Sequence, residues 1–229
     1  MPGRLIQDPP DLAEFLSLFG VKPAAALIKN WQPRYNLAPH EDALCVVGGR
    51  KRKLVELRWG LVPSTEKDSA LAKKPINARS ETVDEKKMFR ESFVQRRCIV
   101  PATGWYEWTP GKLKPQPHCI RHADGKPLAF AGLYDHWDSG VGVTIDSFLV
   151  ITCQPNAKMA KLHHRMGCIL DPADYDAWLD PKTEPDALRA LLRPCPDEWL
   201  THFTVSNIVS DKRNKGKSCI KPGKLSERY

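Results

Sequence analysis

Four short segments of the chain carry polar residues that packing alone does not require. They are Gly3–Arg4, INARSET at 76–82, GWYEW at 104–108 and LHHRM at 162–166. Among them, Asn77, Glu107 and His163 supply an amide, a carboxyl group and an imidazole, which are groups that orient substrates and move protons. Each also has a structural explanation: Asn77 in a turn or cap, Glu107 paired with an arginine, and His163 at the end of a helix. The individual segments therefore leave both explanations open.

Glu107 has the most unusual neighbours of the three. Trp105, Tyr106 and Trp108 surround it in the sequence. A carboxylate among aromatic rings must be paired, or its pKa rises. A carboxyl group with a raised pKa keeps its proton closer to neutral pH and can donate it, so we predict that Glu107 is an acid.

Pro2 becomes the first residue of the chain if Met1 is removed, and the enzymes that remove Met1 generally accept a small second residue such as proline. The ring nitrogen of a terminal proline is a secondary amine, which is a nucleophile once it is deprotonated. An unperturbed α-amine has a pKa of about 7.7–8.0, and a nearby cation such as Arg4 favours the unprotonated form. The alternative is a disordered tail without a role.

The overall composition limits the type of protein. The chain has 229 residues, which is enough to bury a core. It has no apolar run long enough to span a membrane and no secretory signal, so we expect a cytoplasmic protein without a membrane partner. Its seven cysteines show no CxxC pair and no Cys/His spacing typical of zinc. We therefore expect reduced thiols, no metal and no cofactor.

The chain is basic, with 35 Lys and Arg against 27 Asp and Glu and a net charge of +8. Such an excess is compatible with a polyanionic partner. Between residues 211 and 229 there are two anions and seven cations, namely Lys212, Arg213, Lys215, Lys217, Lys221, Lys224 and Arg228. This segment is predicted to be either a solvated tail or an arm that contacts phosphates.

Helical and strand-like patterns follow one another without a repeating βαβ order. Helices are predicted at 11–30 with a break near Gly20 and Pro23, and at 82–97, 155–164, 172–179 and 185–193. Strands are predicted at 42–49 and 53–62, paired as a hairpin, and at 98–108, 117–123, 127–137 and 147–155. The helical spacing at 82–97 turns inward Val83, Met88, Phe89 and Phe93.

The mixed order of helices and strands predicts an α+β fold. No internal repeat or low-complexity linker divides the chain. We therefore expect one domain over residues 1–229, with a basic C-terminal segment at about 211–229.

An ordered series of motifs resembles the SOS-response-associated peptidase (SRAP) family, whose members sense abasic sites in single-stranded DNA. The motifs are MPGRLIQ, RYNLAP, RWGLVPS, INARSET, RRCIVPATGWYEW, AFAGLYDHW, FLVITC and LHHRM. The resemblance extends from residue 1 to about residue 220. It implies a single α+β domain with a curved, barrel-like, mostly antiparallel sheet flanked by helices, and DNA in a basic cleft.

The resemblance also implies roles for individual residues. In the family, the residue after the initiator Met is a cysteine, whose amine and thiol capture the ring-opened aldehyde of an abasic site as a thiazolidine. The corresponding catalytic residues here are Pro2, Asn77, Glu107 and His163. The implied contacts with single-stranded DNA are Arg4, Asn36, Arg79, Trp108, Thr152 and Arg165.

Three positions depart from the family pattern. Pro2 replaces the cysteine and has no sulfur. The chain continues STEKDSALAKK at 64–74, where the family often has a tryptophan that unstacks a base pair. Gly167 replaces the proline that usually follows HxRM, which predicts a looser loop after His163.

Proline changes the chemistry that these residues can perform. A secondary amine adds to an aldehyde and loses water to give a cationic iminium, which acidifies the next sugar carbon and permits β-elimination of the 3′ phosphate. Our leading hypothesis is therefore abasic-site processing through the N-terminal amine, with covalent or lyase-type chemistry. The alternatives are a DNA-binding relative that lost its chemistry and an N-terminal-nucleophile peptidase. A bacterial protein of this kind is expected at the nucleoid.

Overall fold

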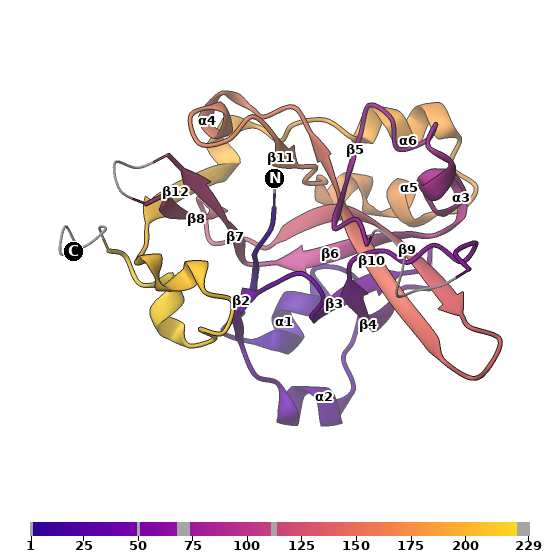
Figure 1. Cartoon of the computed structure of the whole chain (residues 1–229), viewed down its shortest axis with the longest axis horizontal. Helices are drawn as coiled ribbons and strands as arrows, with labels where there is room; N and C mark the ends of the chain where they lie inside the picture. The colour runs from indigo at the N-terminus through magenta and orange to yellow at the C-terminus, as the bar shows by residue number, and fades with distance from the viewer. Residues whose placement is uncertain (1, 50, 68–73, 111–113, 224–229) are drawn as a thin grey trace.

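Apolar residues at strand spacing form two sheets that share one core (Figure 1). The structure is a computed structural model and describes residues 2–49, 51–67, 74–110 and 114–223. The first sheet has the order β12-β8-β7-β1-β2, with strands β1 (Leu5–Gln7), β2 (Arg34–Leu37), β7 (Gly104–Thr109), β8 (Gln116–His122) and β12 (Leu200–Thr204). The second sheet contains β3 (Asp42–Val47), β4 (Lys53–Trp59), β5 (Asn77–Arg79), β6 (Arg97–Ala102), β9 (Leu128–Asp138), β10 (Thr144–Cys153) and β11 (Met166–Gly167).

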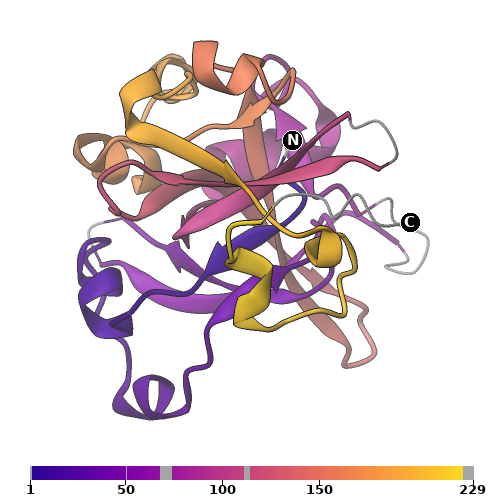
Figure 2. The same cartoon turned by 90° about the vertical axis from the view of Figure 1, so that its left-hand side faces the viewer.

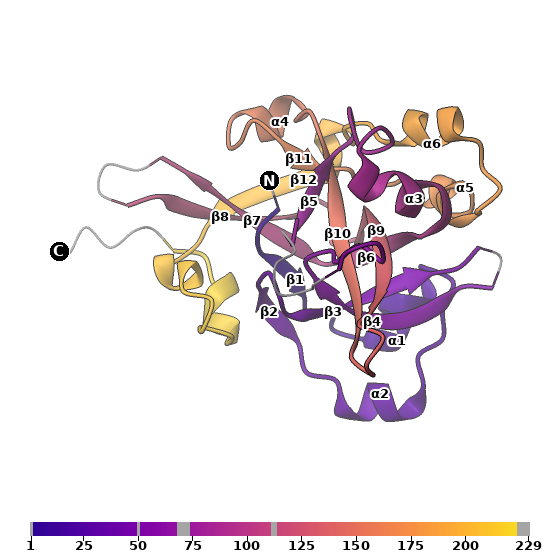
Figure 3. The same ribbon diagram turned by 45° about the vertical axis from the view of Figure 1, so that its right-hand side comes forward.

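The second sheet closes on itself as a barrel. β10 pairs with β4, β4 with β3, β3 with β6, β6 with β9, and β9 pairs back with β10. β5 and β11 pair with β10 outside this ring, and Figure 3 shows both beside the upper part of β10. The pairs of β10 with β4 and β5 are parallel and the others are antiparallel. The predicted α+β class and barrel-like sheet are thus confirmed.

Short helices connect and flank the strands. They are α1 (Leu12–Ser17), α2 (Ala25–Asn30), α3 (Lys87–Gln95), α4 (Ala157–Ala160), α5 (Tyr175–Leu179) and α6 (Pro185–Leu191), with 3-10 turns η1 (Pro172–Asp174), η2 (Asp197–Trp199), η3 (Asn207–Ser210) and η4 (Lys217–Ile220). In the part of the chain that the structure describes, no helix has the length and hydrophobicity needed to cross a membrane. All seven cysteines are buried.

Most of the predicted elements are present, with shifted ends. The break between α1 and α2 is confirmed, and Gly20 at φ +72° provides the left-handed residue there. α3 begins only at Lys87, because residues 81–86 form turns. Val83 is nevertheless buried, whereas the prediction for Met88 was wrong, since 36% of it is exposed.

The strand predicted at 98–108 is two strands that belong to different sheets. β6 lies in the barrel and β7 in the five-stranded sheet, and Thr103 lies between them. The backbone N–H of Thr103 donates to the carbonyl of Ile6 in β1. A single apolar run therefore carries the chain from one sheet to the other, which periodicity cannot reveal.

The C-terminal segment, defined here as residues 206–223, packs against the five-stranded sheet (Figure 2). Its apolar residues join a small core formed by Ile6, Tyr106, Cys119, Val205, Val209 and Cys219. The segment is therefore anchored to the sheet, although Lys212, Arg213, Lys217 and Lys221 are exposed to solvent. A solvated tail and an arm that contacts phosphates both stay predictions. Lys224 and Arg228 lie outside the described residues.

Gln7 joins the two sheets. Its side chain is buried, and Nε2 donates to the carbonyls of Leu44 in β3 and Pro101 in β6 at 3.0 and 2.7 Å. Its Oε1 accepts from the N–H of Leu44 at 3.1 Å. One amide thus satisfies three buried backbone groups and fixes β1, the strand that begins at the N-terminus, against the barrel.

Replacing Gln7 with methionine should destabilise the fold by about 2–4 kcal/mol, because the side chain keeps its length but leaves three buried backbone groups without partners. Urea denaturation measures this difference. Gln95→Met, at an exposed position of α3, is the matched control and should change the free energy of unfolding by at most about 0.5 kcal/mol. Equal effects of the two substitutions would show that Gln7 does not join the sheets.

Candidate functional site

Strand β1 places the start of the chain against β7. Leu5 is paired with Trp105, and the N–H of Tyr106 donates to the carbonyl of Arg4 at 3.1 Å. Continuing this antiparallel register beyond β1 brings Gly3, the residue after Pro2, opposite Glu107. In Figure 1 the N-terminus lies between the β7–β8 hairpin and β11.

Pro2 is buried at this end of β1 and contacts two further strands. Nδ2 of Asn77 in β5 donates to the carbonyl of Pro2 at 2.8 Å. The other amide atom of Asn77, Oδ1, is buried and has no hydrogen-bond partner among the described residues. It is therefore available to accept from an amine or a sugar hydroxyl. The structure thus joins Asn77 to Pro2 and places Glu107 opposite the neighbouring residue, Gly3.

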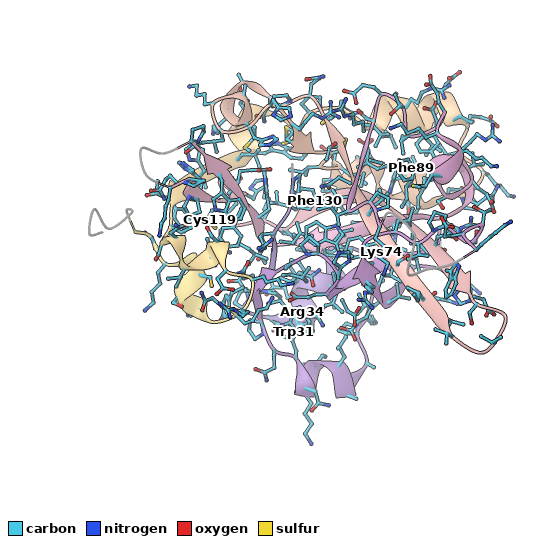
Figure 4. The ribbon with its side chains drawn as sticks, in the orientation of Figure 1. Trp31, Arg34, Lys74, Phe89, Cys119 and Phe130 are labelled. Atoms are coloured by element: carbon cyan, nitrogen blue, oxygen red, sulfur yellow. The ribbon has the colours of Figure 1, made fainter. Side chains whose placement is uncertain are left out.

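Gly167 gives the ring of Pro2 the space that it occupies. A Cβ atom at position 167 would lie 3.2 Å from Cγ of Pro2 and 2.5 Å from the ring of Phe130, which Figure 4 shows near the centre of the molecule. Gly167 lies in β11, where it is buried and pairs with Thr152 of β10. The looser loop expected from this glycine is therefore absent, because position 167 lies in a strand and not in a loop.

Burial dominates the electrostatics of Glu107. Only 3% of Glu107 is exposed, and this burial raises the pKa of its carboxyl group, while the positive charge of the chain's N-terminus opposes the shift. The prediction of a raised pKa at Glu107 agrees with this environment. A carboxyl group in this state can donate a proton closer to neutral pH than an exposed glutamate can.

His163 follows α4 and is held in its neutral form. Burial, followed by the positive charges of the N-terminus and His164, lowers the pKa of His163 to about 4. Its Nδ1 accepts a hydrogen bond from the N–H of Arg165 at 3.0 Å, and its ring stacks on that of His164 with centroids 4.3 Å apart. An imidazole with this pKa is unprotonated at pH 7 and is a weaker base than an exposed histidine. The same burial therefore favours the uncharged forms of both Glu107 and His163.

Arg165 and Thr152 stabilise the site from within the protein. Arg165 is 5% exposed, forms a bidentate ion pair with Glu81, and donates to the carbonyl of Thr152 at 2.6 Å. The Arg165 guanidinium lowers the pKa of Glu81 to about 2. Thr152 is fully buried, and its hydroxyl donates to the carbonyl of Ala78. Neither residue presents the surface expected of a DNA contact.

Asn36 differs from its predicted role for the same reason. It is fully buried, and Nδ2 donates to the carbonyls of Val209, Asp211 and Asn214 in the C-terminal segment. Its amide therefore anchors that segment to β2, and no surface of Asn36 remains for DNA.

The other three predicted DNA contacts reach the surface to different degrees. Arg79 is exposed on β5. Arg4 is partly buried, its guanidinium donates to the carbonyl of Ser210 at 3.4 Å, and burial lowers its pKa. Trp108 is partly exposed, and its Nε1 donates to Oγ of Ser210 at 2.9 Å. Contact of these three residues with DNA remains a prediction.

Several residues of the site were not singled out from the sequence. Glu81 lies inside the INARSET motif, but its partner Arg165 is 84 residues away. His118 is the cross-strand partner of Glu107, which the alternation of PHCIRHA alone could not show. Phe130 lies in an apolar run without a distinguishing feature. Within the described residues, no group of three or more His, Cys, Asp or Glu side chains could hold a metal ion.

A cavity of about 580 Å³ lies at the other end of β1. It is lined in part by Trp31, Arg34, Tyr35, Glu41, Glu56 and Lys215, and Figure 4 shows Trp31 and Arg34 side by side above α2. The guanidinium of Arg34 lies 5.1 Å from the centre of the Trp31 ring and pairs with Glu56. The lining does not include Pro2 or Glu107, so the candidate site rests on the contacts of Pro2 and not on this cavity.

Comparisons with known proteins agree with this fold. Residues 1–212 match the family model described as SOS response associated peptidase (SRAP). The chain is 38% identical over 195 residues to the abasic site processing protein YoqW of Bacillus subtilis (strain 168), and the match covers 83% of this chain and 86% of that protein. It is 33% identical over 224 residues to the abasic site processing protein HMCES of Xenopus tropicalis, and the match covers 83% of this chain and 66% of that protein. A crystal structure of a protein from Bacteroides thetaiotaomicron has the same fold, with a TM-score of 0.84 at 23% identity over 96% of this chain and 99% of that chain.

Proposed function

Because this chain belongs to the SOS response associated peptidase (SRAP) family, we propose that it processes abasic sites in DNA through the amine of Pro2. The names of its relatives support the substrate. The observation that carries the proposal is the surroundings of Pro2, which is buried, is bound by Asn77 and precedes Gly3, the residue opposite Glu107. Removal of Met1 is part of the proposal, because only then is the nitrogen of Pro2 a free amine.

The first steps form an iminium. The lone pair of the Pro2 nitrogen attacks the aldehyde carbon of the ring-opened sugar, and the proton of that nitrogen passes by way of neutral His163 to the former aldehyde oxygen, which gives a carbinolamine. Glu107 then donates a proton to the carbinolamine hydroxyl, which leaves as water. The product is a cationic iminium, because the proline nitrogen has no hydrogen left to lose. The raised pKa of Glu107 supports its role as the acid, and the lowered pKa of His163 keeps its imidazole unprotonated before the reaction.

The next steps break the strand. A base such as His163 removes a proton from the sugar carbon beside the iminium, and the electron pair of that C–H bond moves toward nitrogen to form an enamine. The enamine then expels the 3′ phosphate, which leaves with its electron pair. Water hydrolyses the remaining iminium and releases Pro2 as the free amine. The protein is therefore proposed to act repeatedly.

Pro2 lacks the atom that would make the covalent link persist. A thiazolidine needs nitrogen and sulfur on one residue, and the seven cysteines of the chain are all buried elsewhere. We therefore propose a transient covalent intermediate and not a stable crosslink. Pro2 also lacks the thiol or hydroxyl of a nucleophilic peptidase, so we do not propose proteolysis.

We further propose that single-stranded DNA is the preferred partner, in the cytoplasm or at the nucleoid. An unpaired strand can bring its aldehyde to a buried nitrogen without the cost of separating a duplex. Arg79 and the exposed cations Lys212, Lys217 and Lys221 of the C-terminal segment are available for phosphates. Phosphate contacts of this kind make the affinity fall steeply with salt.

Changing Pro2 should alter the fate of the covalent link in a defined way. With the Met1-free protein and abasic single-stranded DNA, borohydride should trap an adduct, and without borohydride cleaved strand should accumulate. Pro2→Cys should give a crosslink that persists without reductant, because cysteine supplies both atoms of a thiazolidine. Pro2→Ala should be trapped by borohydride but should not crosslink stably. Denaturing gel electrophoresis separates these products.

Intact-mass measurement on the untagged protein is the control for removal of Met1. The proposal is contradicted if the Met1-free protein gives no trapped adduct. If only Pro2→Cys then reacts, the protein is a DNA-binding relative that has lost its chemistry.

Glu107→Gln should slow formation of the trapped adduct by about 10²-fold, the usual contribution of a general acid. The rate of the parent protein should fall as pH rises through the raised pKa of Glu107, since the acid loses its proton, and the variant should lack this fall. Binding to undamaged strand should stay nearly unchanged. Glu85→Gln, at an exposed position, is the control, and equal rates for the two variants would exclude Glu107 as the acid.

A further inference from the structure

Two histidines lie on the same face of the five-stranded sheet as Glu107. His118 in β8 is the direct cross-strand partner of Glu107. In β12, His202 is the partner of Ile120, two residues beyond His118. Directly opposed residues share a face of a sheet, and so do residues two apart along a strand. Glu107, His118 and His202 therefore point to the same side.

The two imidazole rings contact each other and leave nitrogen atoms without partners. Their centroids are 5.3 Å apart with an angle of 66° between the planes. Nε2 of His118 lies 3.1 Å from the hydroxyl of Thr109. The Nδ1 atoms of His118 and His202 are both buried and have no hydrogen-bond partner in the described part of the chain. Buried polar atoms without partners are rare in folded proteins and indicate a missing ligand or a role.

The surroundings of the pair are positive. Burial lowers the pKa of His202, and the positive charges of Lys158 in α4 and of Lys161, which follows α4, lower it further. Burial, and then the charge of His202, lowers the pKa of His118. Lys158 also donates through Nζ to the carbonyl of Leu200 at the start of β12. Glu107 in β7 is an acidic group directly opposite His118, and its own burial favours the uncharged form.

We propose that His118 and His202, with Lys158 and Lys161, form a binding site for a DNA phosphate next to the lesion, and that the histidine pair takes up protons from solvent as this phosphate binds. Neighbouring strands are about 4.8 Å apart, so His118 lies about 10 Å and His202 about 14 Å from β1. The pair is therefore beyond the sugar bound at Pro2 and within reach of an adjoining nucleotide. This placement of the DNA rests on the proposed function.

Phosphate is the ligand that fits these groups best. A protonated histidine donates from both ring nitrogens, and the two lysines supply further donors and charge. Both histidines are partly exposed, so a ligand can approach them from solvent. In the free protein the pair is neutral because burial and nearby cations disfavour protonation. A phosphate reverses this balance, so binding takes up protons.

The sign of the pH dependence follows from this linkage. The histidine pKa values are lowered in the free protein and raised in the complex. Affinity should therefore rise as pH falls from 8 to 6 and level off below the pKa of the free protein. A shift of one pKa unit corresponds to a change in affinity of about tenfold.

The test measures binding to a single-stranded oligonucleotide that carries a tetrahydrofuran in place of the abasic sugar, because this analogue has no aldehyde. Fluorescence anisotropy between pH 8 and pH 6 should show affinity rising about tenfold for the parent protein. His118→Gln/His202→Gln should bind more weakly than the parent at pH 6 and should lose most of this rise between pH 8 and pH 6. His136→Gln is the matched control, since His136 is exposed on β9 and pairs with Asp146.

A set of oligonucleotides, each with one uncharged methylphosphonate linkage at a different position, locates the phosphate that binds. Neutralising one particular phosphate should remove the pH dependence of the affinity. His202→Gln alone, which leaves the contact of His118 with Thr109 intact, should remove part of it. The proposal would be overturned if the pH dependence of the affinity were unchanged in the double variant. It would also be overturned if no methylphosphonate substitution affected that pH dependence. Because the analogue cannot react with Pro2, failure here is distinct from failure of the amine chemistry.

Discussion

The position of β1 is the constraint on which the site depends. Its three residues pair with β7 on one side and β2 on the other, and the amide of Gln7 joins it to two strands of the barrel. This anchoring determines where the chain in front of β1 must lie. Pro2 thereby meets Asn77 from β5 and Gly167 from β11, although these residues are far apart in sequence. A terminal residue that is normally free to move is fixed by the strand that follows it.

Burial then sets the chemistry around Pro2 with one physical effect. Exclusion from water disfavours charge, so it raises the pKa of Glu107 and lowers that of His163. The result is a carboxyl group that holds its proton closer to neutral pH and an imidazole that stays unprotonated there. Arg165 is the exception, because its bidentate pair with Glu81 compensates its charge.

The sequence predicted the elements and the motifs better than it predicted which side chains face solvent. The β3–β4 hairpin and the break at Gly20 follow from local turn and glycine signals, and both are present. Asn36 and Thr152 were expected at the DNA surface but bind backbone carbonyls inside the protein. Their partners come from segments more than 70 residues away, so no local pattern could show them. The role of His118 likewise depends on strand pairing, which only the folded chain defines.

The central claim is that the nitrogen of Pro2 is the reacting atom, and identification of the modified residue tests it most directly. The adduct formed with abasic single-stranded DNA is reduced with borohydride, the DNA is digested, and the protein is cleaved before aspartate residues, so that residues 2–7 form one peptide ahead of Asp8. Tandem mass spectrometry should find the reduced sugar on this peptide, attached to the nitrogen of Pro2. A sugar attached to a lysine, or an unmodified peptide that still begins with Met1, would contradict the account.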